Sequence, residues 1–538
     1  MRKNSRLFLR SLLSISVLPL VAAARPPSPV EVPVRLGLPS PTPLSGRLII
    51  FASPAKQGAK PVNSVDANPF AATPTAVAAR EISSLSHGQL ATVDAETDSV
   101  PTPWSKLPAG KYQIQAVLDV NHNYNYSGRQ AGDVVSNVAT VRLPGPIKPL
   151  VLSKVLPGKD PYAPRTPQMQ AVAPFLSKIV PIDFVSSKLS AFWGRPIHMR
   201  GSIALPPAYQ ASATQTWPTI YQTHGFGGDA VSARWTAAAR LKLMTEGQIP
   251  PMIWVALDES SPTGTHEFAD SVNNGPWGEA LTTELIPWLE RTYRMDGRPS
   301  GRFLTGHSSG GWATLWLQTR YPAIFGGTWS TSPDPSDFHD FTGADIYRPN
   351  ANVYVDANGR PIPLVRMNGK DVANLEDFAK LESVLGPVGG QMASFDWVFS
   401  PRGADGRPMQ MFDRRTGAVN PAVAAYWRDH YDIAYRLEHN WPALRGELGG
   451  KIHLIVGTAD TFHLEGAAHK LQAVLQKLGD PADVRFLPGK THMDLYEANG
   501  DPNALTKQIA KEMYAIARPA ATATAATNVP PVRANPRQ

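Results

Sequence analysis

The chain has 538 residues, more than one ordinary domain requires, and 42% of them are hydrophobic and 18% charged, as in globular proteins. The sequence contains no cysteine, which excludes disulfides, thiol catalysis and cysteine-bound metals. The formal net charge is +8, but no stripe of Lys and Arg interleaved with aromatic residues is present, so we expect no nucleic-acid partner.

The first residues have the pattern of an export signal. Basic residues in "MRKNSRLFLR" precede the short apolar run "SLLSISVLPLV", and three alanines at 22–24 provide an A-x-A cleavage site. The apolar run is too short to span a bilayer comfortably. We therefore predict a signal peptide over residues 1–24 and a secreted or periplasmic mature protein without a membrane span. Cleavage would remove four positive charges and lower the net charge from +8 to +4.

Residues 25–150 are predicted to form a β-sandwich accessory domain. Apolar and polar residues tend to alternate in "KYQIQAVLDV" and "VATVRL", a pattern that is typical of strands, and no long helical period is present. The stretch "LPAGKYQIQAVLDVNHNYNYSG" resembles the small transthyretin- or immunoglobulin-like domains of exported bacterial proteins.

An Asn-rich motif follows the first of these strand patterns, "KYQIQAVLDV". Asp119, Asn121, Asn123 and Asn125 repeat at every second residue, a spacing at which side-chain oxygens can converge on Ca²⁺. The central Gly and the bidentate Glu of an EF-hand loop are missing. Asp119, Asn121 and Asn123 are therefore weak calcium candidates. The alternative is a hairpin loop whose Asx side chains bond their own backbone.

After a Pro-punctuated linker at 151–180, the pattern changes. Over residues 181–518, apolar strands such as "TIYQT" and "PMIWVALD" alternate with helical patterns such as "DAVSARWTAAARLKLM". This alternation predicts an α/β fold whose mostly parallel sheet has helices on both faces. The alternation stops over 333–447, which we interpret as an insertion capping the sheet. The Pro-, Ala- and Thr-rich residues 519–538 are predicted to be a disordered tail.

The stretch "GHSSG" (306–310) matches G-x-S-x-G, a pattern that also arises by chance. Here it lies between an apolar strand and an amphipathic helix, where a nucleophile elbow has to be. We expect Ser308 to be the nucleophile, with Gly306 and Gly310 leaving room for its strained backbone. The alternative is a glycine-rich helix start with a capping serine.

A second glycine-rich turn, "HGFGG" (224–228), follows the strand "TIYQT". Acyl transfer builds an oxyanion that needs backbone N–H donors. In hydrolases with this elbow, one donor is the residue after the nucleophile and the other lies on an earlier strand–helix loop. We predict Ser309 and Phe226 as these donors, with Gly227 next to Phe226. A purely structural turn is the alternative.

Two polar residues complete a triad in the order Ser, Asp, His. Asp460 follows the apolar strand in "LIVGTAD", and His492 follows the next strand, in "VRFLPGKTH". Both would lie at the carboxyl ends of parallel strands, where open α/β sheets build their sites. We expect His492 to be the base and Asp460 the acid, although Asp460 could instead cap a helix. Asp334 and Asp337, after an earlier strand, are the alternative acids.

Residues from about 180 to 515 resemble the "Putative esterase" family of α/β-hydrolases, which includes esterase D, feruloyl, acetyl-xylan and enterochelin esterases and the mycolyltransferases. The motifs that carry the resemblance are "HGFGGD", "ELIPWLERTYR", "GHSSGGW", "GGTWSTSPDPSDF", "GTAD" and "GKTH". The resemblance implies an α/β-hydrolase fold with Ser308 as nucleophile, His492 as base and Asp460 as acid. The insertion at 333–447 departs from the family pattern.

The sequence thus predicts an exported serine hydrolase that cleaves a small-molecule or polymer-linked carboxylic ester through an acyl-enzyme, without a cofactor. A serine peptidase or acyltransferase on the same fold is one alternative. A non-catalytic glycan-binding or adhesion protein that retains the fold is another. Because the predicted triad and oxyanion donors all follow residue 220, we expect the N-terminal domain to stand apart from the catalytic machinery.

Overall fold

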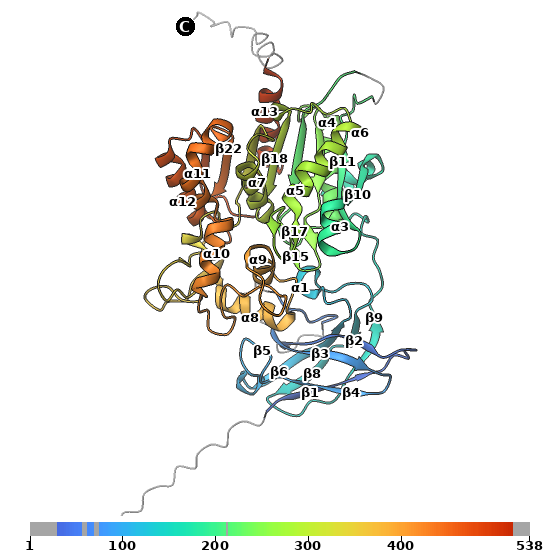
Figure 1. The fold of residues 1–538 in the computed structure, drawn as a ribbon. Helices are drawn as coiled ribbons and strands as arrows, with labels where there is room; N and C mark the ends of the chain where they lie inside the picture. Colours follow the sequence, from blue (N-terminus) through green and yellow to red (C-terminus); the bar gives the residue numbers. More distant parts are fainter. Residues whose placement is uncertain (1–28, 56–61, 69–74, 211–213, 520–538) are drawn as a thin grey trace, which may run out of the picture.

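The computed structural model describes residues 29–55, 62–68, 75–210 and 214–519 (Figure 1). The predicted signal peptide and nearly all of the predicted tail lie outside the described residues. The N-terminal strands gather at the bottom of Figure 1, and the larger mixed α/β part lies above them. In the part of the chain that the structure describes, no helix combines the length and apolarity that crossing a bilayer needs.

The N-terminal strands form a separate sheet, in agreement with the predicted accessory domain. The hydrogen-bonded order is β4-β1-β9-β7-β6-β2-β3-β5, with β8 also paired to β6. β1 and β9 are parallel, and the other pairs are antiparallel. The strands are β1 (Glu31–Leu36), β2 (Leu44–Pro54), β3 (Ala76–Leu85), β4 (Leu90–Asp94), β5 (Ser99–Val100), β6 (Gly110–Asp119), β7 (Val134–Ser136), β8 (Ala139–Leu143) and β9 (Leu150–Val155), with the short helices η1 (Trp104–Lys106) and α1 (Tyr124–Ser127) between them.

Strand β2 is buried on both faces, which explains its continuous apolar run "LIIFA". Leu48 and Ile50 point into the core of the N-terminal domain. Ile49 and Phe51 belong to a second core, which also contains Val384 and Leu385 from a helix of the α/β part. A strand with two buried faces cannot show alternation. The N-terminal domain therefore shares an apolar interface with the rest of the chain.

The α/β part contains an eight-stranded sheet in the order β10-β11-β13-β12-β18-β19-β22-β23. β11 is antiparallel to both neighbours, and the remaining pairs are parallel, which confirms the predicted α/β-hydrolase architecture. Because β11 alone runs in the opposite direction, the carboxyl ends of the other seven strands of this sheet lie at one edge. The strands are β10 (Val180–Ser186), β11 (Ile197–Ala204), β12 (Thr219–Thr223), β13 (Ile253–Leu257), β18 (Arg302–His307), β19 (Gly327–Thr331), β22 (Ile452–Gly457) and β23 (Asp483–Leu487).

Helices cover both faces of this sheet. One face carries α4 and α13, whose Ala237, Ala238 and Met513 share a core. The other carries the α5–α6 region, with Leu281 and Leu289 in a different core. The helical segments outside the sheet's long insertion are α2 (Pro167–Val172), η2 (Ala173–Lys178), α3 (Ser187–Trp193), α4 (Ala230–Thr245), α5 (Trp277–Ala280), the π-helical η3 (Leu281–Leu285), α6 (Ile286–Thr292), η4 (Pro299–Gly301), α7 (Ser309–Arg320), α12 (Glu465–Leu478) and α13 (Ala504–Ala517). Two short hairpins pair β14 (Ser260–Ser261) with β15 (Gly264–Thr265) and β16 (Asp270–Ser271) with β17 (Gly275–Pro276).

Residues 332–451, the cap segment, separate β19 from β22. Its core is aromatic: Phe338, Phe399 and Trp427 pack on one another, and Phe399 also contacts Trp312 of α7. This contact joins the cap segment to the helix that follows the predicted elbow. Its elements are η5 (Phe338–Asp340), β20 (Pro363–Met367), β21 (Lys370–Asn374), α8 (Leu375–Leu385), α9 (Gln391–Phe399), α10 (Pro421–Tyr431) and α11 (Ile433–Leu448).

Candidate active site

Ser308 occupies a strained turn between β18 and α7. Its φ is 61° and its ψ is −126°, a combination that L-residues rarely adopt. A methyl group on Gly306 would lie 2.1 Å from the Gly310 carbonyl oxygen, and one on Gly310 would lie 2.3 Å from the His224 carbonyl oxygen. Side chains at 306 and 310 are therefore excluded by backbone. This is the geometry that the sequence pattern predicts for a nucleophile elbow.

Asp460 and His492 form a buried hydrogen-bonded pair at the same edge of the sheet. The His492 Nδ1 and Asp460 Oδ2 atoms are 2.9 Å apart, and the two side chains are 5% and 0% exposed. The loops after β22 and β23 bring them together. Burial opposes ionisation of Asp460, but the hydrogen bond and charge of His492 outweigh it, so the pKa of Asp460 lies below its usual value.

The paired imidazole lies close to the elbow. The rings of His492 and His307, the residue before Ser308, have centroids 4.2 Å apart, and the Phe462 ring packs edge-on against His492 at 4.8 Å. Because Nδ1 faces Asp460, Nε2 is the nitrogen left for proton exchange. The structure thus brings the predicted acid and base together beside the predicted nucleophile.

The alternative acids make their hydrogen bonds elsewhere. Asp334 Oδ2 accepts a hydrogen bond of 2.6 Å from the Ser309 hydroxyl. Asp337 Oδ1 accepts from the His339 backbone N–H at 2.9 Å and lies 2.8 Å from the ring Nδ1. Burial raises the pKa of Asp334 to about 6 although the Ser309 hydroxyl opposes that shift. The hydrogen bond with His492 favours Asp460 as the acid.

The loop at 224–228, hereafter the oxyanion loop, runs directly against the elbow. A methyl group on Gly225 would lie 3.0 Å from the His307 carbonyl oxygen and 3.1 Å from Ser308 Cβ. Gly227 has a φ of +82°, which glycine adopts without strain. Ser309 begins α7, so its amide has no acceptor within the helix. The predicted donors, Phe226 and Ser309, therefore come from two backbone segments that meet at Ser308.

A buried carboxyl beneath the oxyanion loop, that of Glu259, was not indicated by the sequence. The Glu259 backbone N–H donates to His224 Nε2 at 3.0 Å, and His224 Nδ1 lies 2.8 Å from the Gly225 carbonyl oxygen. The Glu259 carboxyl is fully buried, and neither of its oxygens has a hydrogen-bond partner among the described residues. Burial, reinforced by the charges of Asp334 and Asp258, raises the pKa of Glu259 to about 8 despite the opposing charge of His224. Only the tertiary structure buries this carboxyl, so no local pattern could reveal it.

The calcium candidates have other partners. Asp119 is buried and accepts hydrogen bonds from the backbone N–H groups of Asn121, Asn123 and Tyr124 at 3.2, 3.3 and 2.9 Å. The Asn125 side-chain amide donates to carbonyls of the cap segment. These bonds favour the Asx-rich loop, the alternative considered for this motif.

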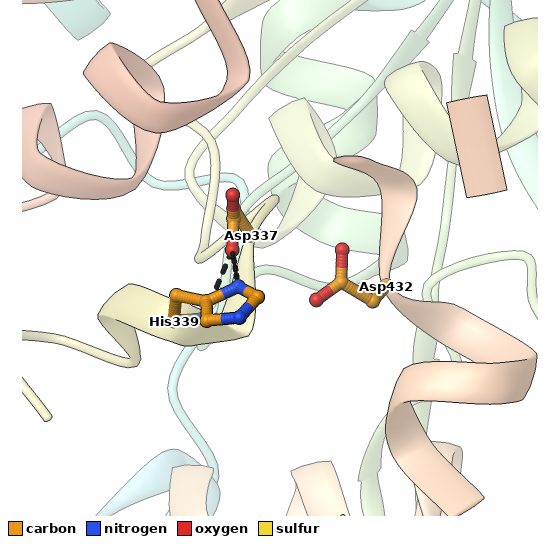
Figure 2. A group of neighbouring side chains, drawn as sticks. All are labelled: Asp337, His339 and Asp432. Atoms are coloured by element: carbon orange, nitrogen blue, oxygen red, sulfur yellow. Dashed lines mark hydrogen bonds and ion pairs between the residues drawn. The ribbon is translucent and has the colours of Figure 1, made fainter. Parts of the chain in front are cut away.

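A different group of side chains could in principle hold a cation (Figure 2). Ligand atoms of Asp337, His339 and Asp432 lie within 4.8 Å of one another. Asp337 bonds to His339, and Asp432 Oδ2 accepts from the Phe338 backbone N–H at 2.9 Å and the Tyr347 hydroxyl at 2.7 Å. Asp432 also caps α11. Local structure accounts for these carboxylates, and exposed His339 is a poor anchor.

Comparison with known proteins identifies the family. A family model described as "Putative esterase" matches residues 194–477, more than half of the chain. The chain belongs to this family. Membership places its α/β part among carboxylic ester hydrolases and agrees with the predicted resemblance. The matched range contains Ser308 and Asp460 and ends before His492.

Individual relatives are more distant. Esterase Rv1288 and Esterase MT1326, from two strains of Mycobacterium tuberculosis, are each 28% identical over 142 residues, which cover 26% of this chain and 30% of each relative. The chain thus spans less than a third of the length of these curated relatives. Similar solved structures include a ferulic acid esterase (TM-score 0.37, 13% identity, 63% of this chain and 97% of that one). S-formylglutathione hydrolase (FrmB) from Staphylococcus aureus is another, with a TM-score of 0.38, 11% identity and coverage of 63% and 98%.

Proposed function

We propose that the protein is an exported serine esterase that cleaves a small-molecule or polymer-linked carboxylic ester through an acyl-enzyme. The observation that carries the proposal is the buried hydrogen-bonded pair of His492 and Asp460, 2.9 Å apart, beside the strained Ser308. A serine hydroxyl is a weak nucleophile until an oriented histidine accepts its proton. Each of these three residues follows its own strand at one edge of the sheet.

In the first half-reaction, Ser308 Oγ attacks the ester carbonyl carbon while His492 Nε2 takes the hydroxyl proton. The carbonyl π electrons move to oxygen, and the backbone N–H groups of Phe226 and Ser309 stabilise the oxyanion. The tetrahedral intermediate collapses, the bond to the alcohol oxygen breaks, and His492 returns the proton to the departing alcohol. The acyl group remains on Ser308.

In the second half-reaction, His492 takes a proton from water as the water oxygen attacks the acyl carbon. Collapse of the second intermediate breaks the bond to Ser308 Oγ, which recovers its proton from His492 and releases the acid. Asp460 holds Nδ1–H throughout and stabilises the imidazolium that forms transiently. These steps use proton transfer and amide donors that the chain itself supplies.

Active-site labelling tests this proposal. The full chain should turn over p-nitrophenyl acetate, and a fluorophosphonate probe should label Ser308. Ser308→Ala should abolish both while the melting temperature stays close to that of the wild type. Ser300→Ala, on an exposed site before β18, is the matched control and should keep both. Labelling at another residue, or persistent turnover by Ser308→Ala, would contradict the assignment.

Export is a separate part of the proposal, supported by the basic and apolar pattern of residues 1–24. Expression of the full chain in a bacterial host should yield a mature protein outside the cytoplasm whose N-terminal sequence begins at Arg25. Recovery of the uncleaved chain in the cytoplasm would contradict export but leave the esterase assignment unaffected.

A further inference from the structure

The short helix α1 of the N-terminal domain lies against the oxyanion loop. The Tyr126 hydroxyl donates a hydrogen bond of 2.6 Å to the Gly228 carbonyl oxygen. Its ring packs edge-on against the Phe226 ring, with centroids 5.0 Å apart. The N-terminal domain therefore contacts both the predicted oxyanion donor and the end of its loop, contrary to the expectation that it stands apart from the catalytic machinery.

Helix α1 is itself fixed on two sides. Asp119 accepts the Tyr124 backbone N–H at 2.9 Å, and the Tyr124 ring packs on Phe51 with centroids 5.5 Å apart. The Asn125 amide donates to the carbonyl oxygens of Glu382 and Gly386 at 2.8 and 2.9 Å. The Asn-rich motif thus holds a rigid turn between the N-terminal domain and the cap segment. Tyr126 projects from that turn.

The oxyanion loop needs such support because three of its five residues are glycines. Glycine has the greatest backbone freedom of any residue, whereas transition-state donors are effective only when held in place before the reaction. A displacement of about 1 Å can cost about 10²-fold in rate. The ring and hydroxyl of Tyr126 contact the loop at Phe226 and Gly228, on either side of Gly227.

We infer that Tyr126 is a positioning residue that holds the Phe226 amide in place for the oxyanion. The inference rests on the proposed serine esterase function. It makes the N-terminal domain a part of the active site's support, through one tyrosine, although it supplies no reacting group.

The test is Tyr126→Phe in the full chain, which keeps the ring on Phe226 and removes the bond to Gly228. We expect kcat on p-nitrophenyl acetate to fall about threefold to tenfold with KM within about twofold, because loss of a whole oxyanion donor costs about 10²–10³-fold. The Ki of a trifluoromethyl ketone, which forms an oxyanion on the serine, should rise by the same factor. Tyr126→Ala, which also removes the ring, should have a larger effect.

Tyr112→Phe is the matched control, since it removes another hydroxyl of the same domain that donates to a backbone carbonyl, that of Pro108 at 2.9 Å. It should leave kcat and Ki unchanged. Wild-type kcat and Ki in a folded Tyr126→Phe variant, with Ser308→Ala inactive, would overturn the positioning role alone. A wild-type chain without Ser308 labelling or turnover would overturn the proposed function and the positioning role together.

Discussion

The two sides of Ser308 are held in place by different means. On the base side, Asp460 and His492 follow the neighbouring strands β22 and β23, and a charged hydrogen bond joins them. On the oxyanion side, the loop after β12 is glycine-rich, contacts Tyr126 of the other domain and covers a buried carboxyl without hydrogen-bond partners among the described residues, that of Glu259. The base side is a local product of the sheet. The oxyanion side depends on parts of the chain that are distant in sequence.

The groups that exchange protons and the amides that stabilise the oxyanion are thus held in place by different kinds of contact. Groups that move protons must be oriented by short, rigid connections, and strand ends provide these. Amide donors must be held just as firmly, but a glycine loop gains its rigidity from contacts outside itself. Changes on the base side should therefore remove the reaction, whereas changes on the oxyanion side should weaken it in proportion to the displacement they cause.

The largest of the effects expected here is that of Asp460→Asn. The substitution removes the charge that orients His492 and leaves the imidazole in the wrong tautomer, a change that lowers kcat about 10⁴-fold in a serine protease. We expect a fall of several orders of magnitude with little change in KM, measured by steady-state ester hydrolysis. Asp337→Asn, a carboxylate bonded to His339 instead, is the control. A small effect of Asp460→Asn would make this residue a structural one.

Gly310→Ala should strain the contact between the nucleophile elbow and the oxyanion loop. The added methyl group would lie 2.3 Å from the His224 carbonyl oxygen and would push the elbow away from the oxyanion loop. We expect kcat to fall about 10²-fold and the free energy of unfolding to fall by about 1–3 kcal/mol. Gly446→Ala in α11, where the methyl group meets open space, should leave kcat unchanged and stabilise the chain by about 0.5–1 kcal/mol. Equal kcat values for the two variants would contradict this steric account.

Asp334→Asn should lower kcat less than Asp460→Asn does, because the asparagine oxygen can still accept the hydrogen bond from Ser309. We expect kcat to change by less than about tenfold, with the main effect on KM or on the melting temperature. Kinetics with p-nitrophenyl esters and a thermal melt provide the two measurements. If the loss of kcat matched that of Asp460→Asn, the acid would belong to the loop after β19.

The base side was largely predictable from the sequence. Ser308, Asp460 and His492 each follow an apolar strand, and parallel strands end at one edge, so local patterns were enough to bring the three together. Steric exclusion at Gly306 and Gly310 follows from the same elbow pattern. The functional roles of these residues remain predictions that the variants above test.

The oxyanion side was only partly predictable. The glycine loop could be found from its pattern, but Tyr126 lies about a hundred residues earlier in another domain, and no local periodicity links the two. The "DVNHNYN" motif suggested a cation site because Asx residues serve both metals and turns. Between α5 and α6 lies the π-helical segment η3, a local irregularity that the sequence pattern does not reveal.

The smallest expected effect is on the free energy of unfolding. Its dependence on pH differs between a carboxyl of the base side, Asp460, and one of the oxyanion side, Glu259. The pKa of Asp460 is lowered in the fold, so its contribution to stability is lost as the pH falls. The contribution of Glu259 to stability changes with pH in the opposite direction. Burial raises its pKa to about 8 from an unfolded value of about 4.3, so the folded chain binds a proton that the unfolded chain has released. Its contribution is complete at low pH and is lost as the pH rises to about 8.

Glu259→Gln replaces this carboxyl with a group that stays neutral, so the variant should lose less stability than the wild type as the pH rises from 5 to 8. The slope is the decisive quantity, because the new amide also adds buried donors whose cost does not depend on pH. Each pH unit between the two pKa values can contribute up to about 1.4 kcal/mol, and denaturant unfolding at several pH values measures it. Glu246→Gln, at the exposed position directly after α4, is the control and should keep the wild-type slope. Parallel slopes for Glu259→Gln and the wild type would mean that Glu259 is ionised in the fold. The oxyanion side would then hold a buried charge, and His224, whose Nδ1 lies 3.9 Å from Glu259 Oε1, would be its partner.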